Sequence, residues 1–174
     1  ATKDLAVKEE ELRQTFEHVQ HGMAFIDLNG NLQKSNRSLS RIIGYSEAEL
    51  RNLTLVDITH PDDFAKSQTL LLEVLDKKRD SYSVEKRFIH KNGAVIWVNH
   101  SLSAIKNDKG EYIHLLSQVD DITDRKKSEL LLIENKNLLE RSHEIGKIGS
   151  WVYLPLEDKV TWSVNLKKML GVEN

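Results

Sequence analysis

The segment from Ser81 to Asp120 places the strongest constraint on the fold. Stretches with the composition of β-strands run from Tyr82 to His90, from Ala94 to about Ile105 and from Tyr112 to about Asp120. Asn92-Gly93 separates the first two runs, and Asp108-Lys109-Gly110 separates the second and third. Glycine supplies the positive φ that tight hairpin turns need. The pattern predicts three antiparallel strands in a meander.

A shorter hairpin precedes this meander. Met23 to Leu28 has the composition of a strand, Asn29-Gly30 is a strong hairpin signal, and Asn31 to Ser35 follows as the return strand. Between this hairpin and Ser81 the apolar spacing is helical, with a capping box at Ser46 and a Pro at the start of the segment after His60. The sequence therefore predicts an α+β domain with a five-stranded antiparallel sheet and its helices on one face.

Amphipathic helices flank the expected domain. Leu5, Leu12 and Val19 recur every seven residues, and the segment after Thr123 is rich in leucine and charge. Periodicity leaves open whether the first helix packs on its own domain or on another chain. We expect four segments: an N-terminal helix at 1–21, the domain at 22–122, a linker helix at 123–145 and a further segment at 146–174.

The last segment repeats the start of the domain. Leu39-x-x-Ile42-Ile43-Gly44 is matched by Leu166-x-x-Met169-Leu170-Gly171, an offset of 127 residues (171 − 44). Because the roughly 25 residues after Gly149 cannot complete a unit of this size, we expect 146–174 to be the truncated start of a second domain of the same kind.

Composition excludes several classes of function. The chain has no cysteine, which excludes disulfides, thiolate metal sites and thiol photochemistry. A net charge of −2 provides no basic stripe for nucleic acid, so no nucleic-acid contact is expected. The apolar runs are short of the roughly 20 residues that cross a bilayer. We expect a cytoplasmic segment without membrane contact, although its parent protein could be anchored elsewhere.

Five short sequence motifs, in order along the chain, resemble those of the PAS (sensory-box, S-box) family, including its PAC motif. They are Ile26-Asp27-Leu28-Asn29-Gly30, Asn36 to Leu50, His60-Pro61-Asp62-Asp63, Lys91-Asn92-Gly93 to Val98, and Asp121 to Lys126. The resemblance covers about Glu10 to Lys127 and implies the PAS fold flanked by signalling helices. It also implies a non-catalytic module for sensing or dimerisation in a signal-transduction protein.

The resemblance implies several possible parents. The preferred parent is a two-component sensor histidine kinase, and the alternative is a diguanylate cyclase or phosphodiesterase. A further alternative is that the module is a protein-interaction scaffold that binds no ligand. We expect a homodimer through the flanking helices and an output domain in the parent chain. The ligand is unknown, and there could be none. Haem and non-covalent flavin are disfavoured, and the flavin–cysteine reaction is excluded because cysteine is absent.

Catalytic and metal chemistry finds little support in the sequence. Ser142-His143-Glu144 resembles a histidine-kinase phosphoacceptor, but Ile148 replaces the expected Pro and two glycines interrupt the helix. The histidines lack the spacing of a metal-binding pair, so no metal site is expected. We therefore expect no catalytic residues.

The expected cavity between sheet and helices has apolar walls and a few polar groups. Candidate wall residues are Phe25, Leu39, Ile42, Ile43, Leu53, Ile58, Phe64, Leu71, Phe88, Val98 and Leu102. Candidate polar groups are Asn36, His100 and Ser117, with Gln118 as a further possibility. Asp121, Ile122 and Thr123 are the candidate signal-transmission residues, because the chain passes there from strand to helix without Gly or Pro.

Overall fold

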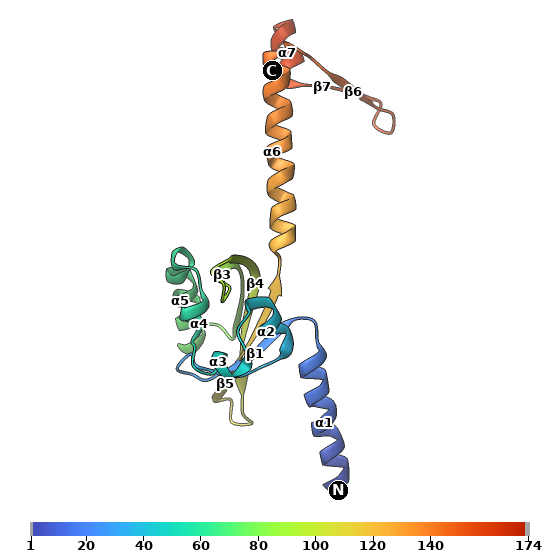
Figure 1. Cartoon of the computed structure of the whole chain (residues 1–174). Coiled ribbons are helices and arrows are strands. Elements are labelled where there is room, and N and C mark those ends of the chain that lie inside the picture. The colour runs from blue at the N-terminus through green and yellow to red at the C-terminus, as the bar shows by residue number, and fades with distance from the viewer. Residues whose placement is uncertain (1, 173–174) are drawn as a thin grey trace. The chain divides into compact units, whose positions relative to one another are not determined.

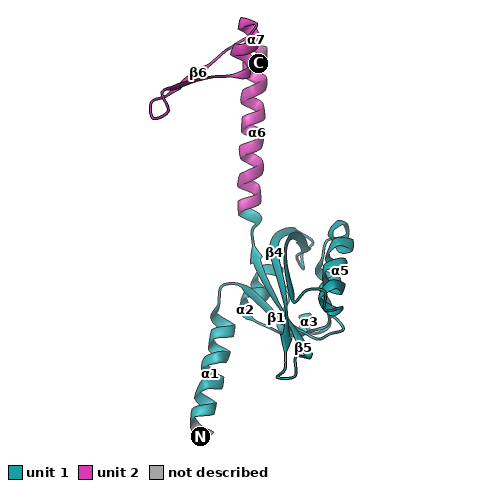
Figure 2. Cartoon of the chain, turned by 180° about the vertical axis from the view of Figure 1, so that it is seen from behind, with its two compact units in different colours: residues 1–124 teal, residues 125–174 magenta. Residues whose placement is uncertain are grey.

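The computed structural model describes residues 2–172. Figure 2 shows two compact units, residues 1–124 and residues 125–174, which are described in turn. The first unit begins with α1 (Thr2–His18), β1 (Gly22–Ile26) and β2 (Leu32–Ser35). It continues with α2 (Arg37–Ile43), α3 (Glu47–Leu50), α4 (Leu55–Ile58), α5 (Pro61–Leu75), β3 (Ser81–Ile89), β4 (Val95–Lys106) and β5 (Tyr112–Asp121).

The five strands form one antiparallel sheet in the order β2-β1-β5-β4-β3. The first strand therefore lies beside the last, with Ala24 opposite Ser117. On the covered face, α5 packs against β3 and β4, and α2 packs against β1 (Figure 1). The five-stranded sheet and the α+β class predicted from the sequence are confirmed.

Local sequence signals set the helix ends. Ser46 and Glu49 form the predicted capping box of α3, and Pro61 occupies the first turn of α5. Gly44 ends α2 with φ +79, where a Cβ would lie 2.3 Å from the His90 ring, so both its conformation and its neighbour require glycine. α2 packs on β1 and α3 on β2, at the same end of the sheet order.

The core lies between the helices and the covered face of the sheet. Because side chains alternate along a strand, every second residue of β4 points into it. Val98, His100 and Leu102 are accordingly buried, while their neighbours are partly exposed. The inward set from β4 meets buried leucines and isoleucines of α2, α3 and α4.

The second unit contains most of α6 (Thr123–Ile145), then β6 (Trp151–Leu154), β7 (Lys159–Trp162) and α7 (Val164–Leu170). β6 and β7 pair as an antiparallel hairpin whose residues are exposed. After Gly149 the chain thus forms two strands and a helix, in the order of β1, β2 and α2 in the first unit.

Backbone contacts in the second unit repeat those of the first at the same offset. Asn36 Oδ1 accepts the Met23 N–H at 2.9 Å, and Ser163 Oγ accepts the Ser150 N–H at 3.0 Å. Each residue of the second pair stands 127 positions after its counterpart (163 − 36 and 150 − 23). In both units this capping residue ties the start of a helix to the start of the first strand.

The closest approach between helix and strand is also repeated. A Cβ on Gly22 would lie 3.1 Å from Leu39 Cα, and a Cβ on Gly149 would lie 2.9 Å from Leu166 Cα. Both positions therefore need glycine to let the helix backbone rest on the strand. The repeat in the sequence thus corresponds to a repeat in backbone geometry.

Candidate ligand cavity and signalling junction

A cavity of about 250 Å³ lies between α4, α5, the β1–β2 turn and the inner side of β3. Its wall is largely apolar and is formed by Leu28, Leu55, Val56, Phe64, Leu71, Leu72, Leu75 and Tyr82. The polar lining includes Thr59, Ser67, Gln68 and Lys86. A concave apolar site with a few polar groups has the general form of a small-molecule pocket.

Lys86 is almost completely buried, with 3% of its surface exposed. Among the described residues that line this cavity, it is the one whose side chain carries a charge at neutral pH. Its Nζ lies 3.3 Å from Ser67 Oγ and 5.0 Å from the centroid of the Phe88 ring. Burial disfavours the ammonium form and lowers the pKa of Lys86 to about 8, although the negative charge of Asp63 opposes this shift.

The carboxylate of Asp63 is bound by Arg87 and not by Lys86. Arg87 donates to Asp63 from its backbone N–H at 2.7 Å, from Nε at 3.0 Å and from Nη2 at 2.8 Å. These hydrogen bonds hold the pKa of Asp63 below its usual value. Within residues 2–172, no carboxylate oxygen lies within 4.0 Å of Lys86 Nζ.

His100 lies deeper in the core, fully buried between the rings of Tyr82 and Phe88. Its Nε2 is 3.0 Å from Ser117 Oγ, while its Nδ1 has no hydrogen-bond partner among the described residues. Desolvation, and then the charge of Lys86, hold the pKa of His100 well below its ordinary value. The imidazole is therefore neutral at physiological pH.

Of the residues expected to line a cavity, two do so and most of the others fill the core. Phe64 and Leu71 line the cavity under α5. The others that point inward fill the core or its margin: Leu39, Ile42, Ile43, Leu53, Ile58, Phe88, Val98, His100, Leu102 and Ser117. Whether any of them contacts a ligand stays a prediction.

The inward orientation predicted for Phe25 is wrong. Gly22, Ala24 and Ile26 occupy the buried positions of β1, so the alternation turns Phe25 to the opposite face. There its ring stacks on Phe16 of α1 with centroids 5.5 Å apart. Phe25 thus anchors the end of α1 to the sheet.

Asn36 is buried and has its hydrogen-bonding groups occupied. Its Oδ1 accepts from Met23 and Leu39, and its Nδ2 donates to the carbonyls of Phe16 at 2.9 Å and His21 at 3.0 Å. A side chain with these four partners has no group left to orient a ligand. Asn36 joins α1, β1 and the start of α2.

Sequence reasoning missed Lys86, Ser67 and the other polar residues on the cavity wall. A signal was present for Lys86, because it shares the inward register of β3 with Tyr82 and Phe88. A lysine in the buried register of a strand is unusual enough to mark a site.

The three expected signal-transmission residues form a continuous junction. β5 ends at Asp121, α6 begins at Thr123, and the Ile122 N–H donates to the Trp97 carbonyl at 2.9 Å. The Thr123 hydroxyl accepts the Trp97 N–H at 3.0 Å, and the Asp121 carboxylate accepts the Thr123 N–H at 2.8 Å. The first residue of α6 is therefore bonded to the sheet.

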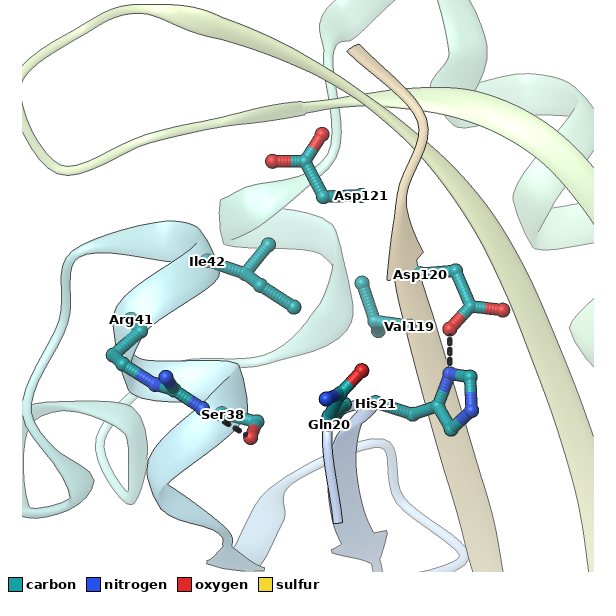
Figure 3. Close-up of a pocket in the computed structure, with 8 residues that line it drawn as sticks. All are labelled: Gln20, His21, Ser38, Arg41, Ile42, Val119, Asp120 and Asp121. Atoms are coloured by element: carbon teal, nitrogen blue, oxygen red, sulfur yellow. Dashed lines mark hydrogen bonds and ion pairs between the residues drawn. The ribbon is translucent and has the colours of Figure 1, made fainter. Parts of the chain in front are cut away.

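A second hollow, of about 640 Å³, lies between the segment after α1 and the end of β5 (Figure 3). On one side of it His21 Nδ1 is paired with the Asp120 carboxylate, and on the other side Arg41 donates to Ser38 Oγ at 2.8 Å. β1 and β5 are neighbours in the sheet. The chain leaving α1 and the chain entering α6 thus lie on adjacent strands.

The described part of the chain offers neither a candidate metal site nor a candidate membrane-spanning helix. Residues 2–172 contain no group of three His, Asp or Glu side chains placed to hold a metal ion. No helix in that range combines the length and apolarity needed to cross a membrane.

Comparison with known proteins gives a consistent result. The model of the PAS fold family matches residues 34–119. Probable diguanylate cyclase DgcE of Escherichia coli (strain K12) is 31% identical over 173 residues, which is 98% of this chain and 15% of that protein. Sensor histidine kinase TmoS of Ectopseudomonas mendocina is 27% identical over 151 residues, 85% of this chain and 16% of that protein. The chain spans only this small part of both relatives.

Solved structures agree on the fold. A sensory box histidine kinase/response regulator from Burkholderia thailandensis superposes with a TM-score of 0.58 at 25% identity, covering 75% of this chain and 98% of that one. An RNA-binding light-oxygen-voltage receptor superposes with a TM-score of 0.65 at 18% identity, covering 76% and 38%.

Proposed function

Because the chain belongs to the PAS family, we propose that it is a sensor and dimerisation module that relays a signal through α6 to an output domain. The observation that carries the proposal is the junction at Thr123, whose hydroxyl is hydrogen-bonded to the backbone of β4. In this mechanism a shift in β4 or β5 is passed through that hydrogen bond to the first turn of α6.

The input side of the module supports the same mechanism. α1 is held to the sheet by the Phe16–Phe25 stack and by Asn36, and β1 pairs directly with β5. A ligand under α5, or a partner on α1, would shift the population of two sheet–helix arrangements in proportion to its differential affinity for them.

The geometry also supports a tandem arrangement. We propose the division made from the sequence, with helices at 1–21 and 123–145, a PAS domain at 22–122 and the start of a second one at 146–174. The repeated cap at Ser163 and the repeated close approach at Gly149 support it. α1 and α6 end 127 residues apart (145 − 18), so both occupy the position of a helix that leads into a PAS domain.

Exposed leucines support a homodimer through these helices. Leu5 and Leu12 lie on α1 seven residues apart, and Leu132 and Leu139 lie at the same offset of 127 on α6 (132 − 5). All four are exposed in the single chain. A seven-residue apolar repeat suits the seam of a two-helix coiled coil, and a second copy of the chain would supply the matching seam.

The relatives indicate the kind of output. We propose that this segment is cytoplasmic and that its parent protein is a histidine kinase or diguanylate cyclase whose catalytic residues lie outside this chain, as the names of its relatives suggest. The cofactor stays unknown, and the domain could function without one. The flavin–cysteine reaction is excluded because the sequence has no cysteine.

The test is an insertion of two glycines after Thr123 in the full-length protein. We expect the output to lose its dependence on the input, while the amide spectrum of residues 22–122 shows that the domain stays folded. The matched control inserts two glycines after Asp108, in the exposed β4–β5 turn, and should leave signalling intact. Signalling that survives the insertion after Thr123 would refute the coupling.

A further inference from the structure

Resting on the proposed sensor function, we propose that the cavity under α5 binds a small monocarboxylate with an apolar body, and that Lys86 Nζ donates hydrogen bonds to its carboxylate. The juxtaposition that points to this ligand is a buried ammonium group on an otherwise apolar wall.

The Lys86 ammonium group has more N–H donors than it has hydrogen-bond acceptors around it. A protonated lysine carries three N–H donors, and within residues 2–172 they find one hydrogen-bond acceptor, Ser67 Oγ, at the long distance of 3.3 Å. The Phe88 ring offers a cation–π contact at 5.0 Å, which uses no hydrogen-bond acceptor. A ligand oxygen in the cavity would satisfy the remaining donors.

The charge balance of the region favours an anion. Asp63, the carboxylate whose charge acts on Lys86, is already bound by the guanidinium of Arg87 through two side-chain hydrogen bonds. The Thr59 hydroxyl on the same wall donates to the Leu55 carbonyl at 2.6 Å and carries no negative charge that could balance the ammonium group. A buried charge without an ionic partner is costly, and an anionic ligand would remove that cost.

The neighbouring core does not offset the positive charge of Lys86. His100, behind Lys86, is fully buried with an unpartnered Nδ1 among the described residues, so the core supplies no compensating negative group from that side. Charge-assisted hydrogen bonds to a carboxylate are among the stronger ones in proteins.

Size and wall chemistry restrict the ligand further. At the roughly 30 Å³ that one water molecule occupies in the liquid, the cavity of about 250 Å³ corresponds to a ligand of roughly eight non-hydrogen atoms. Phe64, Leu71 and Leu75 present apolar surface, which suits a hydrocarbon body. A phosphate dianion would place two charges against one ammonium and leave this surface unfilled.

The probes are benzoate and benzamide, which have the same shape and differ in charge. We expect the purified chain to bind benzoate at least roughly tenfold more tightly than benzamide, measured by chemical-shift titration of the backbone amides. Lys86→Met keeps the unbranched apolar stem and should abolish the preference for benzoate while retaining benzamide. Lys66→Met, on the exposed side of α5, is the matched control and should keep the preference.

A second measurement does not depend on a variant. In the wild-type chain, benzoate should raise the titration midpoint of the Lys86 ¹³Cε signal by about one pH unit, because a ligand that binds the charged form tenfold better shifts the equilibrium by that amount. Equal binding of the two probes, absence of binding, or an unchanged midpoint would overturn the inference. The glycine insertion after Thr123 needs no ligand, so its result separates a failure of the proposed function from a failure of this inference.

Discussion

Replacing Asn36 with alanine tests whether one side chain holds together the entrance to the domain. Asn36 is 1% exposed and makes four hydrogen bonds. Two of them cap α2 and fix the start of β1, and two hold the carbonyls at the end of α1 and before Gly22. Alanine removes all four hydrogen bonds at once and leaves their backbone partners in place.

The expected loss of stability follows from these bonds. Loss of a helix N-cap costs about 1 kcal/mol. Each buried group left without a partner adds about 1 kcal/mol or more, and the Met23 N–H and two carbonyls are affected. Because some of these groups can reach water at the domain edge, we expect Asn36→Ala to lower the free energy of unfolding by about 3 kcal/mol.

Asn36→Ser separates the two halves of this role. Serine stands at the equivalent position of the second unit, where Ser163 caps α7 and accepts from Ser150. There a different residue, Asn165, donates to the preceding carbonyls of His143 and Ile148, each at 2.7 Å. Asn36→Ser should therefore keep the caps, lose the donated bonds and cost about half as much as alanine.

Urea unfolding followed by Trp97 fluorescence is a suitable assay, with exposed Trp151 and Trp162 replaced by Phe. The control is Asn52→Ala, an exposed asparagine whose change should stay within about 0.5 kcal/mol. If Asn36→Ala cost no more than this control, or if serine were as damaging as alanine, the account of the junction would be wrong.

Three further predictions concern the junction, the cavity and the repeat. Thr123→Val removes the hydroxyl that accepts the Trp97 N–H, and should destabilise the domain by about 1–2 kcal/mol and weaken signal coupling, with amide exchange at Trp97 as the measurement; unchanged exchange would contradict it. The pKa of Lys86 is about 8 in the folded chain and 10.5 by reference, so between these values the unfolded state binds more protons and stability should rise with pH, by about 2 kcal/mol from pH 8 to 9.5. Lys86→Met should flatten this rise, and a profile that stayed steep would exclude Lys86 as its source. Gly22→Ala places a Cβ 3.0 Å from Leu39 Cδ1 and should cost about 1–3 kcal/mol in thermal unfolding, whereas a neutral effect would show that α2 can move away.

Sequence patterns predicted the local elements well. Gly30, Gly93 and Gly110 all adopt positive φ at the three predicted hairpin turns. The cap at Ser46 and the Pro at the start of α5 were equally readable. These features need backbone conformations that few residue types adopt readily, so a short stretch of sequence is enough to predict them.

The faces of the strands were harder to assign. Phe25 is as apolar as the residues around it, and only the buried positions of Ala24 and Ile26 show that it points away from the core. Likewise, Asn36 looked like a polar group in a pocket because its four partners are spread over α1, β1 and α2. Such partners are brought together only by the assembled sheet.

The sequence by itself determined the strand and helix order and the turns, because these depend on propensities and spacings within a few residues of one another. It also determined the repeat, because the same short pattern recurs 127 residues later. Only the tertiary structure decided that Lys86, among the described residues, has no carboxylate oxygen within 4.0 Å of its Nζ, while adjacent Arg87 binds Asp63. The two side chains are neighbours in sequence and both basic. Alternation along β3 and the position of α5 send one inward and the other outward, and burial then gives them different chemistry.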